Sequence, residues 1–114
     1  MAMLVLTVTA ALAADVIVNI YVQGRQVSMQ PAPRVRNGVT YGPLRASAEA
    51  VGAHVTWSAA NRTATICTDD RCVPIKQSQG IMVGNSIMIP VRLMSEALGR
   101  EVTWDSAAKA VRIK

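Results

Sequence analysis

Residue types that build nucleic-acid-binding surfaces are scarce in this chain of 114 residues. It has no Phe, two Trp and two Tyr, and its basic residues are scattered singly, although the net charge is +5. Nucleic-acid-binding domains of this size usually combine clustered positive charge with aromatic side chains or a recognition helix. The composition therefore argues against nucleic acid as a partner. A dispersed positive charge also suits an anionic wall polymer or lipid headgroups, or simply favours solubility.

Metal ligands and catalytic groups are also few. Two Cys and one His, His54, cannot supply the four nitrogen or sulfur ligands of a typical zinc site. Met82, Met88 and Met94 carry thioethers that suit Cu(I), but their positions on expected core faces favour a gap-filling role. The acidic residues lack a Ser, Cys or His partner in any recurring motif. We therefore expect no catalytic residue, no metal and no cofactor, and we classify the chain as non-enzymatic.

The chain opens with an uncharged apolar segment, "MAMLVLTVTAALAA". Ala11 and Ala13 have the A-x-A spacing that signal peptidase accepts. The segment is shorter than the roughly 20 residues that a membrane-spanning helix needs. We predict a signal peptide at 1–13, rather than a hydrophobic first strand, and a secreted or envelope location. The mature chain, 14–114, is expected to be one domain with no transmembrane span.

Two cysteines, Cys67 and Cys72, flank four polar residues in "CTDDRC". This spacing is typical of the end of a β-hairpin, and an oxidising compartment would let the two thiols form a disulfide. A metal site that adds Asp69, Asp70 or His54 is a weaker alternative, because the chain has too few good ligands. Free thiols are expected if the protein is not exported.

One pattern occurs twice in the sequence. At an offset of 47, residues 43–66 match 90–113 at ten of 24 positions without a gap. A unit of this length is usually one supersecondary element that cannot bury its apolar face alone, so the two units should pack together. The recurring residues that we expect to form the structural motif are Pro43, Arg45, Glu49, Gly52 and Trp57 in the first unit, and Pro90, Arg92, Glu96, Gly99 and Trp104 in the second.

Each unit predicts the same local structure. A proline at the start and a glycine just past the end frame short helices at 44–51 and 91–98. An Asn-Gly turn at Asn37 and a Gly-Asn turn at Gly84 predict a hairpin before each helix, and alternating residues predict another hairpin after it.

We therefore predict an α+β fold in which two tandem β-hairpin, short-helix, β-hairpin repeats form a small antiparallel sheet packed on two short helices. The pseudo-repeats span about 34–67 and 81–114, and an N-terminal hairpin occupies 16–30.

The recurring charged and aromatic residues have structural explanations. In each predicted helix the Arg and Glu stand four residues apart, so they can pair on one helical face. Such a pairing favours the charged form of the Glu, which makes it a poorer general base. Trp57 and Trp104 are expected to pack in the core, because aromatic burial stabilises strongly. The alternative is that they are exposed and stack against a carbohydrate.

These motifs resemble the copper amine oxidase N-terminal domain-like family, the stalk domains of bacterial secreted proteins. The resemblance covers 16–114 and rests on Asn37-Gly38, Pro43-Leu44-Arg45, Glu49, Gly52, Val55 and Trp57, then on Pro90-Val91-Arg92, Glu96, Gly99, Val102, Trp104 and Asp105. It implies a small non-catalytic domain attached to varied extracellular proteins. It implies no oxidase, because the modified tyrosine in an Asn-Tyr motif and the three copper-binding histidines have no counterpart here.

The sequence thus predicts an exported, stalk-like structural or interaction domain that acts at the cell envelope. Its partner would be an anionic wall polymer, contacted by Arg34, Arg36 and Arg112, or another envelope protein. One alternative is a small module that binds a wall glycan or another carbohydrate. A second alternative is a regulatory partner of an extracellular enzyme.

Overall fold

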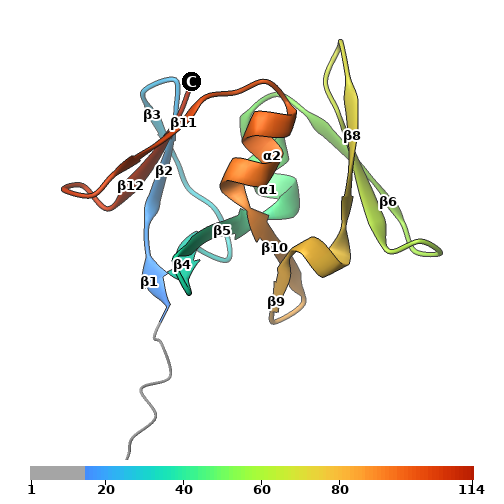
Figure 1. The fold of residues 1–114 in the computed structure, drawn as a ribbon, viewed down its shortest axis with the longest axis horizontal. Helices are drawn as coiled ribbons and strands as arrows, with labels where there is room; N and C mark the ends of the chain where they lie inside the picture. The colour runs from blue at the N-terminus through green and yellow to red at the C-terminus, as the bar shows by residue number, and fades with distance from the viewer. Residues whose placement is uncertain (1–14) are drawn as a thin grey trace, which may run out of the picture.

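The computed structural model describes residues 15–114, so the predicted signal peptide at 1–13 lies outside the described residues. Strands take up 48% and helices 17% of the described chain. The strands form three sheets around two short helices (Figure 1). The prediction of one small antiparallel sheet packed on two helices is therefore wrong, and the fold is mainly β. The error arises because the hairpins that follow the helices leave the central sheet and build two sheets of their own.

The central sheet consists of β1 (Val16–Ile17), β4 (Arg34–Arg36), β5 (Val39–Pro43), β10 (Ser86–Pro90) and β9 (Ile81–Val83), in this spatial order. The hairpins predicted at Asn37-Gly38 and Gly84-Asn85 are present in it, as β4–β5 and β9–β10. Asn37 and Gly38 both have positive φ, 52° and 77°, the backbone that makes Asn-Gly a favoured hairpin turn.

The two hairpins meet where β5 pairs with β10 in antiparallel register. Gly42 stands opposite Ile89 at the middle of this pairing. Both residues are buried, and a Cβ built on Gly42 would lie 2.6 Å from the Ser47 Oγ atom. A side chain at this position would force Ser47 of the following helix to shift, so the close approach of β5 to that helix favours glycine.

Each central strand leads directly into a helix, α1 (Leu44–Ala50) after β5 and α2 (Val91–Ala97) after β10. Pro43 and Pro90 immediately precede the two helices, with φ of −56° and −58° that leads into helical backbone. The apolar residues that recur on one face of each helix or just past its end are all buried: Leu44, Ala48, Val51, Val91, Met94 and Leu98.

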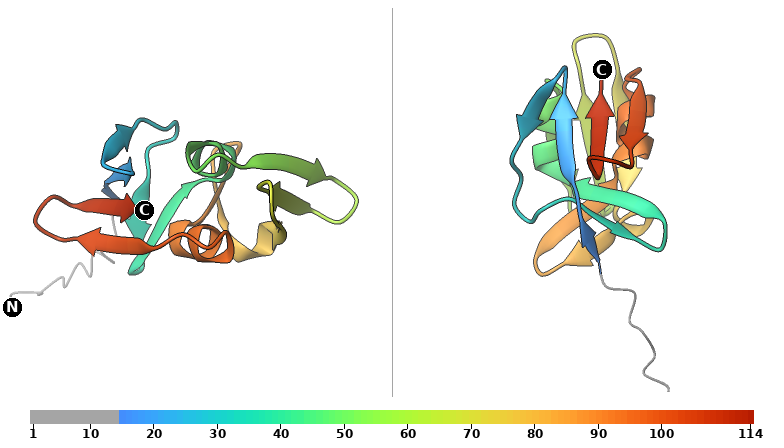
Figure 2. Two further views of the ribbon diagram at one scale, coloured as in Figure 1. Left: turned by 90° about the horizontal axis from the view of Figure 1, so that it is seen from above. Right: turned by 90° about the vertical axis from the view of Figure 1, so that its left-hand side faces the viewer.

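The two outer sheets extend in opposite directions from the helix pair, as Figures 1 and 2 show. We call them wings. The first wing holds β6 (His54–Ser58), β7 (Thr63–Cys67) and β8 (Cys72–Lys76), and a short 3₁₀ turn, Gln77–Gln79, leads from it back to the central sheet. The second wing holds β3 (Arg25–Val27), β2 (Asn19–Val22), β12 (Ala110–Ile113) and β11 (Val102–Asp105).

The second wing joins the beginning and the end of the described chain. β2 pairs with β12 in parallel, with Ile20 opposite Val111 and Val22 opposite Ile113. These four residues are buried. A parallel pair within the sheets contradicts the purely antiparallel sheet that we predicted. Because β12 is the last strand of the chain, the fold of the N-terminal hairpin depends on the C-terminal segment.

Candidate functional site

Two surface grooves flank the helix pair. The Trp104 groove, about 600 Å³, lies between α2, β11 and the β4–β5 hairpin. The Trp57 groove, about 450 Å³, lies between α1, β6 and the β9–β10 hairpin. In each groove the helix and the tryptophan come from one of the two sequence units, and the hairpin comes from the other. Both grooves therefore depend on the β5–β10 pairing that brings the units together.

The tryptophans are the main exposed aromatic groups of these grooves. Trp57 is 39% exposed and Trp104 is 45% exposed, so the prediction that they pack in the core is wrong. Strand geometry explains the result. Val55 and Val102 lie two residues earlier on the same strand faces, partly buried against the core, whereas each tryptophan lies further out along its wing. The two tryptophans recur at equivalent positions because each forms part of the wall of a groove.

The predicted Arg–Glu pairs are present beside the tryptophans. Arg92 Nη1 lies 3.3 Å from Glu96 Oε1, and Arg45 Nη1 lies 4.0 Å from Glu49 Oε1. All four side chains are more than half exposed, so each pair contributes at most about 1 kcal/mol to stability. Each pair supplies the only charged residues that line its groove, and each groove therefore carries no net charge.

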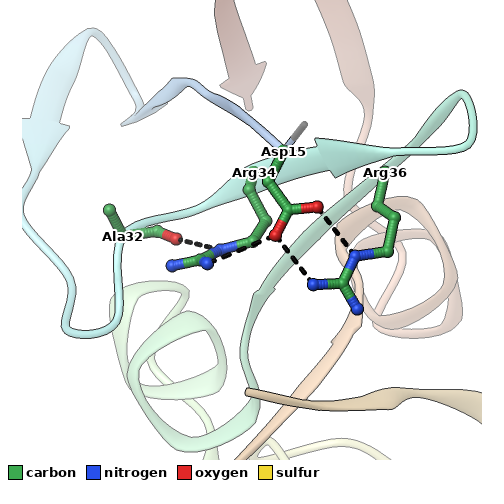
Figure 3. Close-up of polar contacts among 4 residues, drawn as sticks. All are labelled: Asp15, Ala32, Arg34 and Arg36. Carbon is green, nitrogen blue, oxygen red and sulfur yellow. Dashed lines mark hydrogen bonds and ion pairs between the residues drawn. The ribbon is translucent and has the colours of Figure 1, made fainter. Parts of the chain in front are cut away.

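Two of the three arginines expected to contact an anionic polymer form ion pairs with a carboxylate of the chain itself, that of Asp15. Arg36 donates to both Asp15 oxygens at 2.7 Å, and Arg34 donates to Asp15 Oδ2 at 3.4 Å (Figure 3). Arg34 also donates through Nε to the Ala32 carbonyl at 3.1 Å. The hydrogen bonds from Arg36, together with its charge and the bond from Arg34, lower the pKa of Asp15 to about 2. These contacts tie the residue before β1 to strand β4.

The third arginine lies in a different sheet. Arg112 Nη2 is 3.3 Å from Asp105 Oδ2, and its guanidinium lies over the Tyr21 ring at 4.7 Å from the centroid. The pKa of Asp105 is lowered, mainly because the Ala108 backbone N–H donates to it and then because of Arg112. The fold thus brings Arg34 and Arg36 together but separates Arg112 from them. A polymer contact by these three residues stays a prediction.

The disulfide predicted between Cys67 and Cys72 is present, with an S–S distance of 2.08 Å. The two residues face each other at the end of the β7–β8 hairpin. Arg71, inside the closed loop, donates to the Ala97 carbonyl at the end of α2 at 3.3 Å. In a matching contact, Arg100 donates to the Val51 carbonyl at the end of α1 at 3.0 Å. Sequence reasoning missed both contacts, because each joins residues far apart in the chain.

Other candidate ligands are dispersed. Within 15–114, no three His, Cys, Asp or Glu side chains are grouped to hold a metal ion. His54 is exposed on β6, and Met88 and Met94 are fully buried while Met82 is 46% exposed. None of the helices in the described part of the chain is long and apolar enough to span a membrane.

Comparison with known proteins supports the resemblance that the motifs indicate. The family model of the copper amine oxidase N-terminal domain matches residues 21–86 and 76–114. No curated protein and no solved structure matches the chain. The matched domain is a non-catalytic part of the copper amine oxidases. The family match covers most of the chain, and the protein therefore belongs to the copper amine oxidase N-terminal domain family.

Proposed function

We propose that this protein is a non-enzymatic, exported interaction domain that holds a partner at the cell envelope in the Trp57 and Trp104 grooves. The observation that carries the proposal is the exposure of both tryptophans beside shaped grooves. Tyr and Trp are enriched at binding interfaces, where one part of the ring packs on apolar atoms and another part reaches water, and both tryptophans here are partly buried in this way.

Export is supported by the disulfide between Cys67 and Cys72. Structural disulfides form and persist mainly outside the cytoplasm, where thiols are not kept reduced. The apolar segment at 1–13, with its A-x-A spacing, is the signal that we propose for this export.

A binding role fits the chemistry of the grooves better than catalysis does. The ionisable side chains that line each groove are one Arg and one Glu, and these neutralise each other. A general base or nucleophile needs a partner that shifts its pKa or removes its proton, and neither groove offers one among the described residues. The grooves are therefore proposed to hold a ligand without changing it.

The test is retention of the mature protein on purified envelope material. We expect Trp57→Ala and Trp104→Ala to reduce retention, and Met82→Ala to leave it unchanged. Met82 is a suitable control because it is as exposed as Trp104 but lies outside both grooves. Equal retention of the parent and of a folded double tryptophan variant would refute the proposal.

Adhesion to an anionic wall polymer is a second candidate function. It is favoured by the basic residues that form no ion pair within 15–114, namely Arg25, Arg62, Lys76, Arg100, Lys109 and Lys114. Salt dependence distinguishes the two candidate functions, because the interaction between exposed charges is largely screened beyond about 8 Å at physiological ionic strength. Retention that is lost as salt rises, and that ignores the tryptophans, would support this second function.

A further inference from the structure

We propose that the two grooves are equivalent sites for an uncharged glycan of β-linked pyranose units, and that one domain holds two glycan segments at once. This inference rests on the proposed function and names its ligand. It combines the equivalence of the grooves, their charge and their separation.

The grooves are built from matching residues. At the offset of 47 that relates the two sequence units, each groove presents the same three functional side chains. The matching pairs are Arg45 and Arg92, Glu49 and Glu96, and Trp57 and Trp104. A duplicated site is of most use for a ligand that itself repeats, because the second contact then adds avidity without a new kind of contact.

The charge of each groove favours a neutral ligand. A polyanion would gain little from a groove whose single Arg is already neutralised by a Glu four residues away. Together, however, such a pair offers planar guanidinium donors and carboxylate acceptors side by side. Adjacent sugar hydroxyls both donate and accept, so they match this pair in either direction.

The tryptophan supplies the apolar half of the recognition. In β-linked glucose-type pyranoses the hydroxyls are equatorial, so each ring has a face of C–H bonds that an aromatic ring can cover. Trp57 and Trp104 have an exposed ring next to a polar pair, and an aromatic group with one apolar and one wet side is suited to such a ligand. The grooves are lined mainly by residues of strands and helices, so binding should cost little conformational entropy of the backbone.

The positions of the grooves indicate two separate glycan segments. The grooves share no lining residue, and each lies at the root of a different wing. The wings extend in opposite directions from the helix pair (Figure 2). The grooves are therefore two separate sites, and a domain with both filled by different glycan segments would link those segments.

The experiment measures binding stoichiometry by calorimetry with purified hexasaccharides of β-1,4-linked glucose and of β-1,4-linked N-acetylglucosamine. We expect at least one of these to bind at two molecules per chain. Trp57→Ala and Trp104→Ala should each leave one molecule per chain, and the double variant should bind none. Met82→Ala should behave as the parent, and Trp→Tyr changes should retain binding because the aromatic ring is kept. On the long polymer, each single variant should lose retention by a factor on the order of 10² or more.

Three results would overturn the inference. The first is binding of one molecule per chain that persists in either single variant, which would refute equivalence. The second is absence of hexasaccharide binding while envelope retention remains tryptophan-dependent, which would refute the ligand but leave the proposed function standing. The third is retention that protease treatment of the envelope material abolishes, which would assign the grooves to a protein partner. Tryptophan-independent retention would instead refute the proposed function itself.

Discussion

A single methyl group at Gly42 should destabilise the centre of the fold. Gly42 lies in β5, opposite Ile89 of β10, where the two hairpins meet. A Cβ atom there would lie 2.6 Å from Ser47 Oγ and 3.1 Å from Val91 Cγ2. Ser47 and Val91 are each 1% exposed, so either side chain would have to shift within the buried core to make room.

The expected loss follows from two opposing terms. Overpacking a close-packed core costs about 1–3 kcal/mol. Replacing glycine by alanine recovers about 0.4–1 kcal/mol, because it lowers the entropy of the unfolded chain. The net destabilisation by Gly42→Ala should therefore be about 1–2 kcal/mol. For a domain of this size, that corresponds to a fall in Tm of roughly 5–10 °C.

Thermal and urea unfolding of the variant provide the assay. A second change, Ser47→Ala, removes the nearest clashing atom, so the double variant should recover much of the lost stability. Ser47→Ala alone gives the matched control, since its hydroxyl makes only a 3.6 Å contact with Met29 Sδ. A Gly42→Ala variant as stable as the parent would show that β5 packs less closely on α1 and α2 than described. No recovery in the double variant would show that the Ser47 hydroxyl is not the group that clashes.

Three further changes test other parts of the structure. Ser95→Ala should raise stability by about 1 kcal/mol, because the buried Ser95 hydroxyl has no hydrogen-bond partner within 15–114; an unchanged or lower Tm would argue against this. The pKa of Asp15 is lowered from 3.8 to about 2, so its carboxylate should stabilise the fold above pH 4 and lose this effect as the pH falls toward 2. A pKa near 3.8 measured by NMR, or an Asp15→Asn variant with unchanged acid sensitivity, would contradict the Arg36 contact. A fragment of residues 15–76 should not unfold cooperatively, because it lacks the β10 and β12 partners of β5 and β2; a sharp two-state transition would refute the dependence of the units on each other.

Local features of the fold were predictable from the sequence. The Asn37-Gly38 turn, the prolines before α1 and α2 and the glycines after them depend on backbone preferences within a few residues. The Cys67–Cys72 disulfide closes a short hairpin, so its spacing alone indicated it. The inward faces of the helices followed from their apolar periodicity.

Contacts between distant segments were not predictable in this way. Alternation along 19–22 indicates a strand but does not say that its partner is β12, near the other end of the chain. The Asp15–Arg36 pair joins residues 21 positions apart, and nothing in either local sequence identifies the other. The tryptophans were misassigned for a related reason. A hydrophobic residue on a strand is expected to face the core. Trp57 and Trp104, however, lie where the wings extend beyond the helices, and the sequence does not show how far the helices cover each wing.

The most direct test of the two-groove account uses the indole N–H signals. Trp57 and Trp104 are the only tryptophans of the chain, so a ¹H–¹⁵N spectrum should contain one indole signal for each. During titration with the β-1,4-linked hexasaccharide that binds, both signals should shift over the same range of ligand concentration, with similar dissociation constants. Movement of one signal alone, or of neither while other backbone signals shift, would contradict the claim that the two grooves are equivalent binding sites.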